Sequence, residues 1–543
     1  MVCRQLSCAA PEIRTLLDID ADRLTPVEVI KVILRAPVDL LWNGGIGTYV
    51  KASTETHSQA ADPANDAVRV NADELRCRVV GEGGNLGFTQ RARVEYALNG
   101  GRINADFIDN AAGVATSDRE VNLKIALEPA VTAGDLSLAE RNCLLAECAD
   151  WTADSVLADC ANQTLAISLA ESRAPALMNR HERLVGNLEQ HHGLDRDSAV
   201  LPARKELAAR TETGRGLTRP EIAMLLAHSK NAVRDELLAS DVPDSCVFAG
   251  VLTNYFPDLV RRRCPEGVSR HRLAREIIAT EVADRLINHV GPGLIHQLEE
   301  RLGMDTPRVA TAYAIVRAVL RVDELWHHAT SLRNARPNAN SRHLQVIQGL
   351  IEKTASWILR NRPHPLDPRA EIARYAEPVG RLLDAYPVFD PDGAPTPHLL
   401  LLGESLGLAE ISAERGLPVG RVAEAYLDVA RDIDILWALD TFERNSTTDY
   451  WESMAAAAVC DELADKLNRL INMILTQSDS TASVAEAVSQ WRERHRRALS
   501  RLRRMVAESR TDGVMDLAHA CTINAELGRI VATTVDSAGR PAT

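Results

Sequence analysis

The feature that most constrains the fold is a glycine-rich turn directly after a short β-branched run. Residues 78–87 read Arg-Val-Val-Gly-Glu-Gly-Gly-Asn-Leu-Gly, so Val79 and Val80 lead into a turn with Asn85 at its apex. Glycine lets the main chain approach a ligand closely and adopt conformations that other residues avoid. Such turns present backbone N–H groups to a nucleotide at the end of a strand in an α/β sheet. We therefore predict a nucleotide-binding turn here.

Two further apolar runs end in loops of the same kind. Residues 38–47 read Val-Asp-Leu-Leu-Trp-Asn-Gly-Gly-Ile-Gly, and residues 106–114 read Asp-Phe-Ile-Asp-Asn-Ala-Ala-Gly-Val. Ligands of open parallel sheets bind outside the carboxyl ends of the strands. Three such ends so close together in the sequence predict a single site.

The order of elements in this region is that of a parallel sheet. We predict strands at residues 38–42, 75–80 and 105–108, and a helix at residues 90–98 that ends at Asn99-Gly100-Gly101. A strand, a helix and a further strand form a βαβ unit, in which the two strands run parallel. A second helix is expected to begin near Ser117.

The composition limits the class of protein. A chain of 543 residues is too long for one hydrophobic core, so two or more domains are expected. The net charge of −13 argues against binding to nucleic acid or to an anionic membrane surface. The ten cysteines include no C-x-x-C pair and no zinc-site spacing, so no metal is implied. Reduced cysteines of this kind fit a cytoplasmic protein.

Helical patterns dominate the remainder of the chain. Residues 1–37 read as a helical lead-in, in which Thr25-Pro-Val-Glu28 has capping-box spacing. Beyond about residue 122, apolar residues recur at helical intervals, and Thr218-Arg-Pro-Glu221 repeats the capping box. We predict an α/β part at residues 38–125 followed by a large all-α region at residues 126–543. Helices within that region are expected at residues 271–290, 307–328, 343–360, 378–386, 418–440, 449–475 and 481–507.

The loops taken together identify a family resemblance. The strict G-x-G-x-x-G pattern fails, because Leu86 stands where a glycine is required when counting from Gly81. Residues 41–51, 81–90 and 107–122 instead resemble the large NAD-specific glutamate dehydrogenases of bacteria. The resemblance extends over the whole chain, with specific motifs confined to residues 38–125. It implies that this segment is the second half of a Rossmann-type NAD-binding domain, followed by a helical C-terminal extension.

The resemblance also implies an activity. Enzymes of this class carry out the oxidative deamination of L-glutamate to 2-oxoglutarate and ammonium with NAD, and we expect a cytoplasmic homo-oligomer. They are far longer, and this chain matches their carboxyl-terminal part, without the catalytic lysine or the first phosphate-binding glycines. We therefore expect a truncated reading frame, a fragment or half of a split enzyme, inactive unless an upstream chain completes the site. A non-enzymatic helical module that kept a cofactor-like loop is the alternative, and another amino-acid specificity stays open.

The candidate cofactor-binding residues lie in the three loops. Asn85 and Asn110 carry amides that can donate and accept hydrogen bonds, which suits a carboxamide or a ribose. The resemblance places Asn85 near the nicotinamide half of NAD, although an asparagine there could also be a left-handed turn residue. The other candidates are the close-approach glycines and the loop residues beside them, namely Asn43 and Gly44 on the adenosine side, Gly83, Gly84 and Ala111.

Four charged or hydroxylated residues carry alternative interpretations. Glu82 either contacts the cofactor or holds the turn by accepting backbone N–H bonds. Ser117 matches the serine that binds the substrate side-chain carboxylate in the family, but Ser117-Asp-Arg-Glu120 is also a capping box. Arg119 could pair with a carboxylate, but exposure on the surface is the favoured expectation. Lys51 is set aside as the catalytic base, because the resemblance places the family lysine outside this chain.

Overall fold

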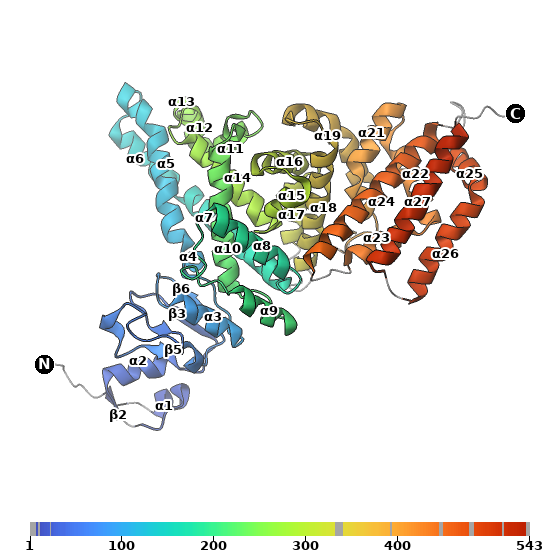
Figure 1. Cartoon of the computed structure of the whole chain (residues 1–543). Coiled ribbons are helices and arrows are strands. Elements are labelled where there is room, and N and C mark those ends of the chain that lie inside the picture. The colour runs from blue at the N-terminus through green and yellow to red at the C-terminus, as the bar shows by residue number, and fades with distance from the viewer. Residues whose placement is uncertain are drawn as a thin grey trace. The chain divides into compact units, whose positions relative to one another are not determined.

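The computed structural model describes residues 7–8, 11–21, 23–331, 340–390, 394–444, 449–476, 483–512 and 515–538. The chain forms two compact units, Met1–Gly293 and Leu294–Thr543. Both units are mainly helical, and the parallel strands lie in the amino-terminal part of the first unit, drawn in blue in Figure 1. This confirms a small parallel sheet followed by a large helical region.

The strands form three short pairs. In the first unit β1 (Ser7–Cys8) pairs antiparallel with β2 (Arg23–Leu24), whereas β3 (Leu40–Asn43) pairs parallel with β6 (Val79–Glu82), and β4 (Val50–Lys51) pairs parallel with β5 (Val70–Asn71). The register of β3 and β6 sets Asn43 opposite Glu82. The two strands therefore end level with each other, and the two glycine turns leave the sheet at the same edge.

The prediction of a third strand at residues 105–108 is wrong. The chain contributes one parallel bridge, between Arg102 and Val79, and then forms the helical turn α4 (Asp106–Asp109). Asp106 is the first residue of this turn, and its carboxylate accepts a hydrogen bond from the N–H of Phe107. A buried run of four residues has the same apolar pattern in a strand and in a short helix, so periodicity could not distinguish them.

One face of the β3–β6 pair is covered and the other is open. Val80 packs with Phe88 and with Ala92 and Tyr96 of helix α3 (Gln90–Leu98) in a buried apolar cluster. On the opposite face Leu40 and Trp42 are exposed, at 54% and 61%. Parallel sheets are usually buried on both faces, so the open face is the unusual feature of this region.

Helix ends in the first unit follow the sequence signals. The capping boxes at Thr25 and Thr218 are both present, and Thr89 caps α3, which ends before Gly100 with its φ of 94°. The remaining helices of this unit are α1 (Pro11–Leu17), α2 (Pro26–Leu34), α5 (Ala111–Ala133), α6 (Leu138–Glu147), α7 (Ala149–Ser172), α8 (Met178–His191), α9 (Arg204–Glu212), α10 (Arg219–Leu238), α11 (Ala249–Asn254), α12 (Asp258–Arg263), α13 (Pro265–Ser269) and α14 (Ala274–Val290).

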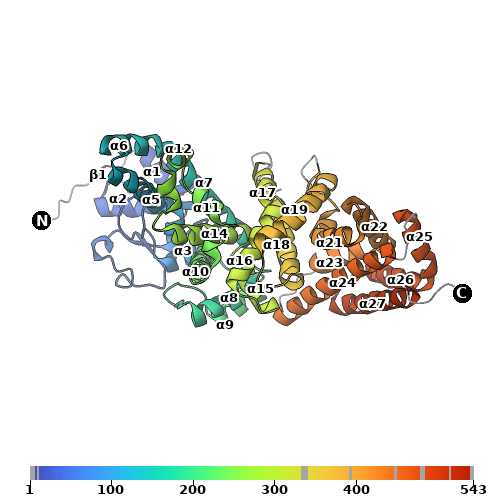
Figure 2. The same ribbon diagram turned by 90° about the horizontal axis from the view of Figure 1, so that it is seen from above.

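The second unit is mainly helical in its described residues, with one isolated bridge between Phe389 and Pro395. Helices α24 (Tyr450–Thr476) and α27 (Leu517–Ala538) pack side by side in both views (Figures 1 and 2). The other helices are α15 (Leu294–Leu302), α16 (Thr306–Val319), α17 (Val322–Ser331), α18 (Asn340–Asn361), α19 (Pro368–Ala385), α20 (Leu399–Gly403), α21 (Ser405–Arg415), α22 (Val419–Asp432), α23 (Ile435–Arg444), α25 (Val484–Arg494) and α26 (Arg496–Asp512). Within the ranges that the structure describes, no helix has the length and apolar character needed to cross a membrane.

Three predicted long helices are each two helices. The break between α16 and α17 falls at Arg321, with φ 51°, and the break between α22 and α23 falls at Asp434, with φ 52°. The prediction at residues 481–507, whose first two residues lie outside the described part, corresponds to α25 and α26 with His495 between them. At Arg321 and Asp434 a single residue in the left-handed region turns the chain without interrupting the apolar pattern, so the sequence signal did not show these two breaks.

Candidate functional site

The three predicted loops lie together at the carboxyl edge of β3 and β6. The N–H of Gly83 donates to the carbonyl of Asn43 at 2.9 Å, and a Cβ placed on Gly84 would lie 3.0 Å from the carbonyl oxygen of Gly45. The Asn110 side-chain N–H donates to Asn85 Oδ1 at 2.9 Å. The loops after β3, β6 and α4 are thus joined, although the third follows a helical turn.

The Asn85–Asn110 pair presents two amides near the surface. Asn85 is exposed, and Asn110 lies between α4 and α5 without capping either helix through its side chain. In the turn after β6 the residue with left-handed backbone conformation is Leu86, with φ 65°. The alternative interpretation, in which Asn85 is the left-handed residue, is therefore wrong. Ala111 is the first residue of α5.

Close packing explains the glycines at the ends of β3 and β6. A Cβ on Gly87 would lie 1.6 Å from Asn43 Nδ2, and a Cβ on Gly44 would lie 3.3 Å from Nε1 of Trp42. The Nδ2 group of Asn43 is buried and has no hydrogen-bond partner among the residues that the structure describes. Buried donors are normally satisfied, so this N–H group is an unexplained polar group beside the two turns.

A buried charge cluster holds the turn after β6. Glu82 has no exposed surface, and its carboxylate accepts two hydrogen bonds from Arg93, at 2.7 and 3.0 Å, and one from the N–H of Phe88. Asp106 lies 3.1 Å from Arg93 and accepts the N–H of Leu86 at 2.9 Å. Burial raises the pKa of Glu82 above its ordinary value, while Arg93 opposes that rise. Glu82 therefore has the turn-holding role that the sequence left open.

Ser117 does not lie where the sequence predicted. Helix α5 begins at Ala111, so Ser117 is in its interior, and the predicted capping box at this residue is wrong. The exposed Ser117 hydroxyl donates to the carbonyl of Val114 at 2.9 Å. A serine and a glutamate three residues apart fit a helix interior as well as a helix start, which is why the pattern misled.

Lys51 and Arg119, like Arg93, are buried. Lys51 is 8% exposed, and its ammonium donates to Asn71 Oδ1 at 2.5 Å and to the carbonyl of Ala52 at 3.2 Å. Arg119 is also 8% exposed, contrary to the prediction, and donates to Asp159 at 2.8 Å and to Glu281 at 3.3 Å. An arginine on a helix reads as a surface residue unless the partners on other helices are known.

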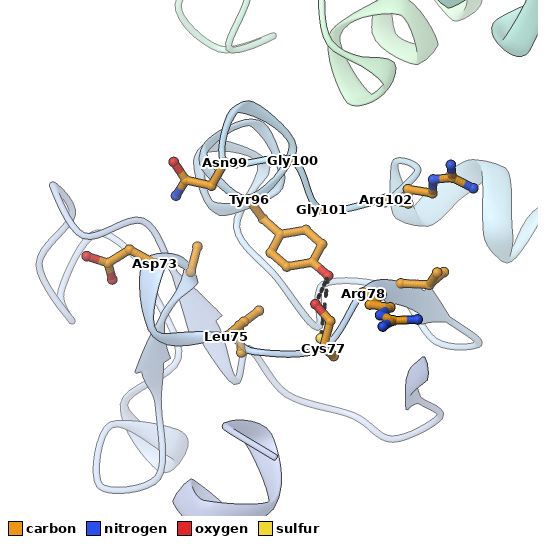
Figure 3. Close-up of a pocket in the computed structure, with 11 residues that line it drawn as sticks. Asp73, Leu75, Cys77, Arg78, Tyr96, Asn99, Gly100, Gly101 and Arg102 are labelled. Atoms are coloured by element: carbon orange, nitrogen blue, oxygen red, sulfur yellow. Dashed lines mark hydrogen bonds between the residues drawn. The ribbon is translucent and has the colours of Figure 1, made fainter. Parts of the chain in front are cut away.

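A cavity of about 550 Å³ lies at the opposite, amino-terminal end of β6 (Figure 3). Tyr96 crosses it and donates its hydroxyl to the carbonyl of Cys77 at 2.8 Å. Burial raises the pKa of the Cys77 thiol, which disfavours a reactive thiolate. None of the predicted site residues lines this cavity, so the candidate site is the edge formed by the three loops.

Comparisons with known proteins match both parts of the chain. Residues 4–170 match the family described as bacterial NAD-glutamate dehydrogenase, catalytic domain, and residues 214–389 and 396–529 match glutamate dehydrogenase, C-terminal. The NAD-specific glutamate dehydrogenase of Pseudomonas aeruginosa is 38% identical over 95% of this chain and 33% of its own length. Those of Halomonas elongata and Mycobacterium tuberculosis are each 34% identical, over 92% and 96% of this chain and 32% and 34% of their own lengths. The chain thus spans about a third of the length of these relatives.

Proposed function

Because this chain belongs to the glutamate dehydrogenase family, we propose that it binds NAD at the three joined loops for the oxidative deamination of L-glutamate. In that reaction glutamate transfers a hydride to the nicotinamide of NAD, and water converts the resulting imino acid to 2-oxoglutarate and ammonium. The three relatives that align with more than nine-tenths of this chain are named NAD-specific glutamate dehydrogenases. A helical module without catalytic function, the alternative from the sequence, is not favoured by these names.

The observation that carries the proposal is the joining of Asn85 to Asn110 beside the two glycine turns. Two features support a dinucleotide here: Asn43 Nδ2 is buried without a partner among the described residues, and small residues at Gly84 and Gly87 keep the two turns closely packed. Asn43, Gly44, Gly83, Gly84 and Ala111 would approach the cofactor through main-chain atoms or small side chains. The sheet would then be part of a Rossmann-type domain.

We propose that the side-chain amides of Asn85 and Asn110 orient the nicotinamide ring. An amide that both donates and accepts can bind the carboxamide of nicotinamide and fix which face of the ring meets the substrate. Asn110 orients Asn85 by occupying its Oδ1, which leaves the Asn85 N–H groups for the ligand. Ser117, on the same helix that begins at Ala111, is proposed to contact the glutamate side-chain carboxylate. We further propose a cytoplasmic homo-oligomer.

Calorimetric titration of the full 543-residue chain with NAD tests the proposal. We expect binding that Asn85→Ala and Asn110→Ala each weaken about tenfold, which is the loss expected for one good hydrogen bond. Asn142→Ala, a change of an exposed asparagine on α6, serves as the matched control and should leave the affinity unchanged. A chain that binds no NAD, or loop variants that bind as tightly as the control, would contradict the proposal.

A second measurement addresses the chemistry. Glutamate-dependent formation of NADH by the same chain, followed by absorbance, reports whether the residues present suffice for turnover. Turnover lost in Asn85→Ala supports a dehydrogenase site at these loops. Turnover that Asn85→Ala leaves intact would place the cofactor elsewhere.

A further inference from the structure

Trp42 forms an aromatic surface across the β3–β6 pair. It is opposite Gly81 in the register of the two strands. A Cβ on Gly81 would lie 2.7 Å from Cε3 of the indole, and a Cβ on Gly83 would lie 2.7 Å from Cζ2. The six-membered ring therefore lies across both glycines, and a side chain at either position would displace it.

The same ring reaches the two turns of the candidate site. Its Nε1 would lie 3.2 Å from a Cβ on Gly83 and 3.3 Å from a Cβ on Gly44. The indole thus extends from the middle of β6 to the residues proposed to approach the cofactor. A ligand seated on these turns would meet the indole beside them.

Most of the indole is accessible to solvent. Trp42 is 61% exposed, although tryptophan is usually among the more buried residues of a protein. Because Gly81 and Gly83 lie beneath the indole, no side chain at these positions occupies the space where the ring lies. A rigid, exposed aromatic ring is a surface on which a nucleobase or another planar heterocycle stacks with little loss of conformational freedom.

We propose that Trp42 is the stacking platform for a planar heteroaromatic ring of the dinucleotide, either nicotinamide or adenine. This inference rests on the proposed NAD site and assigns to it a residue that the loop motifs did not indicate. It also explains the glycines at position 81, within β6, and at position 83, directly after it, because a side chain at either position would displace the indole. The indole occupies the space above them and presents its other face to the ligand.

The test is titration of the full chain with NAD and, separately, with ADP-ribose, which lacks nicotinamide. Trp42→Ala is expected to weaken NAD binding about tenfold, and Trp42→Phe, which keeps an aromatic ring, only about threefold. Trp451→Ala is the matched control, because Trp451 is a 74% exposed tryptophan on α24. It should bind NAD as the unmodified chain does.

The two ligands identify the ring that stacks. A loss with NAD but not with ADP-ribose in Trp42→Ala assigns nicotinamide, and a loss with both ligands assigns adenine. If Trp42→Ala does not fold, tryptophan fluorescence offers a second test of stacking. Quenching by NAD that is larger in the unmodified chain than in Trp42→Phe supports stacking on Trp42.

The failure of each idea has its own signature. An unmodified chain that binds NAD with an affinity unchanged in Trp42→Ala overturns the stacking role and leaves the NAD site standing; the exposed indole would then face another protein surface. An unmodified chain that binds neither ligand overturns both the proposed function and this inference.

Discussion

Two buried arginines in the first unit occupy similar surroundings with different consequences. Arg93 lies between Glu82 and Asp106 below the glycine turn, and Arg119 lies between Asp159 and Glu281 where α5, α7 and α14 meet. Both guanidinium groups are paired with two carboxylates. Such pairs contribute little net free energy of folding, whereas loss of one partner leaves an uncompensated charge in the interior.

The two clusters differ in the further groups that they contact. Glu82 and Asp106 accept backbone N–H groups from Phe88 and Leu86, so their positions set the path of the turn. The arginine of the second cluster packs on the ring of Tyr255, with its Cζ 4.5 Å from the centroid, and joins side chains of separate helices. The first cluster therefore shapes the turn that we propose binds NAD, and the second holds helices together.

Removal of the loop arginine should have the largest effect. Arg93→Met leaves Glu82 fully buried without its cation, so the free energy of unfolding should fall by about 3–5 kcal/mol, measured by urea denaturation. NAD affinity of the folded fraction should fall as well, because the turn loses its anchor. Arg93→Lys keeps the charge but not the paired hydrogen bonds. Its free energy of unfolding and its NAD affinity should therefore lie between those of the unmodified chain and those of Arg93→Met. Full NAD affinity in a folded Arg93→Met variant would refute the distinction between the clusters.

The matching change in the helical cluster should affect stability alone. Arg119→Met is expected to lower the free energy of unfolding by about 2–3 kcal/mol, because Asp159 and Glu281 keep some contact with water. NAD affinity, measured by the same calorimetry, should stay at the level of the unmodified chain. A selective loss of affinity without loss of stability would show that the second cluster also acts on the site.

The pH dependence of stability sharpens the comparison further. Burial raises the pKa of Glu82 above its ordinary 4.5, so just above that pH the folded chain keeps a proton that the unfolded chain has lost. The contribution of Glu82 is complete below the ordinary value and is lost as the pH rises through the raised value. The free energy of unfolding should therefore fall over this interval more steeply than in Glu82→Gln. The pKa of Glu281 is raised by burial too, and Glu281→Gln should remove a separate part of the slope. Equal slopes in all three proteins would contradict both assignments.

The smallest effect is expected at Ser117. Among the described residues its hydroxyl bonds to the preceding turn of its own helix alone, so Ser117→Ala should change the free energy of unfolding by less than about 0.5 kcal/mol. Steady-state kinetics then isolates the proposed contact with substrate, since a raised KM for glutamate with unchanged NAD affinity would support it. An unaltered KM would remove Ser117 from the substrate site.

Local signals predicted the secondary structure best where they were chemically specific. The capping boxes at Thr25 and Thr218 and the glycine stop after α3 are all present, since a cap needs only neighbouring residues to form. The predictions of a third strand and of a helix start at Ser117 were wrong. A four-residue run such as Ala-Asp-Phe-Ile at residues 105–108, and a serine three places before a glutamate, are each compatible with more than one conformation. Arg321 and Asp434 turned single predicted helices into pairs without any signal in the apolar pattern.

The sequence by itself determined that three Asn- and Gly-containing loops follow one another within a parallel-sheet segment, and that a long helical region comes after it. These properties depend on glycine conformation and apolar periodicity, which are local. Only the tertiary structure decided that Asn110 bonds to Asn85, that Arg93 and Arg119 are buried, and that Trp42 lies across Gly81 and Gly83. Each of these depends on residues brought together from different elements, and burial in particular is set by neighbours that no single stretch of sequence contains.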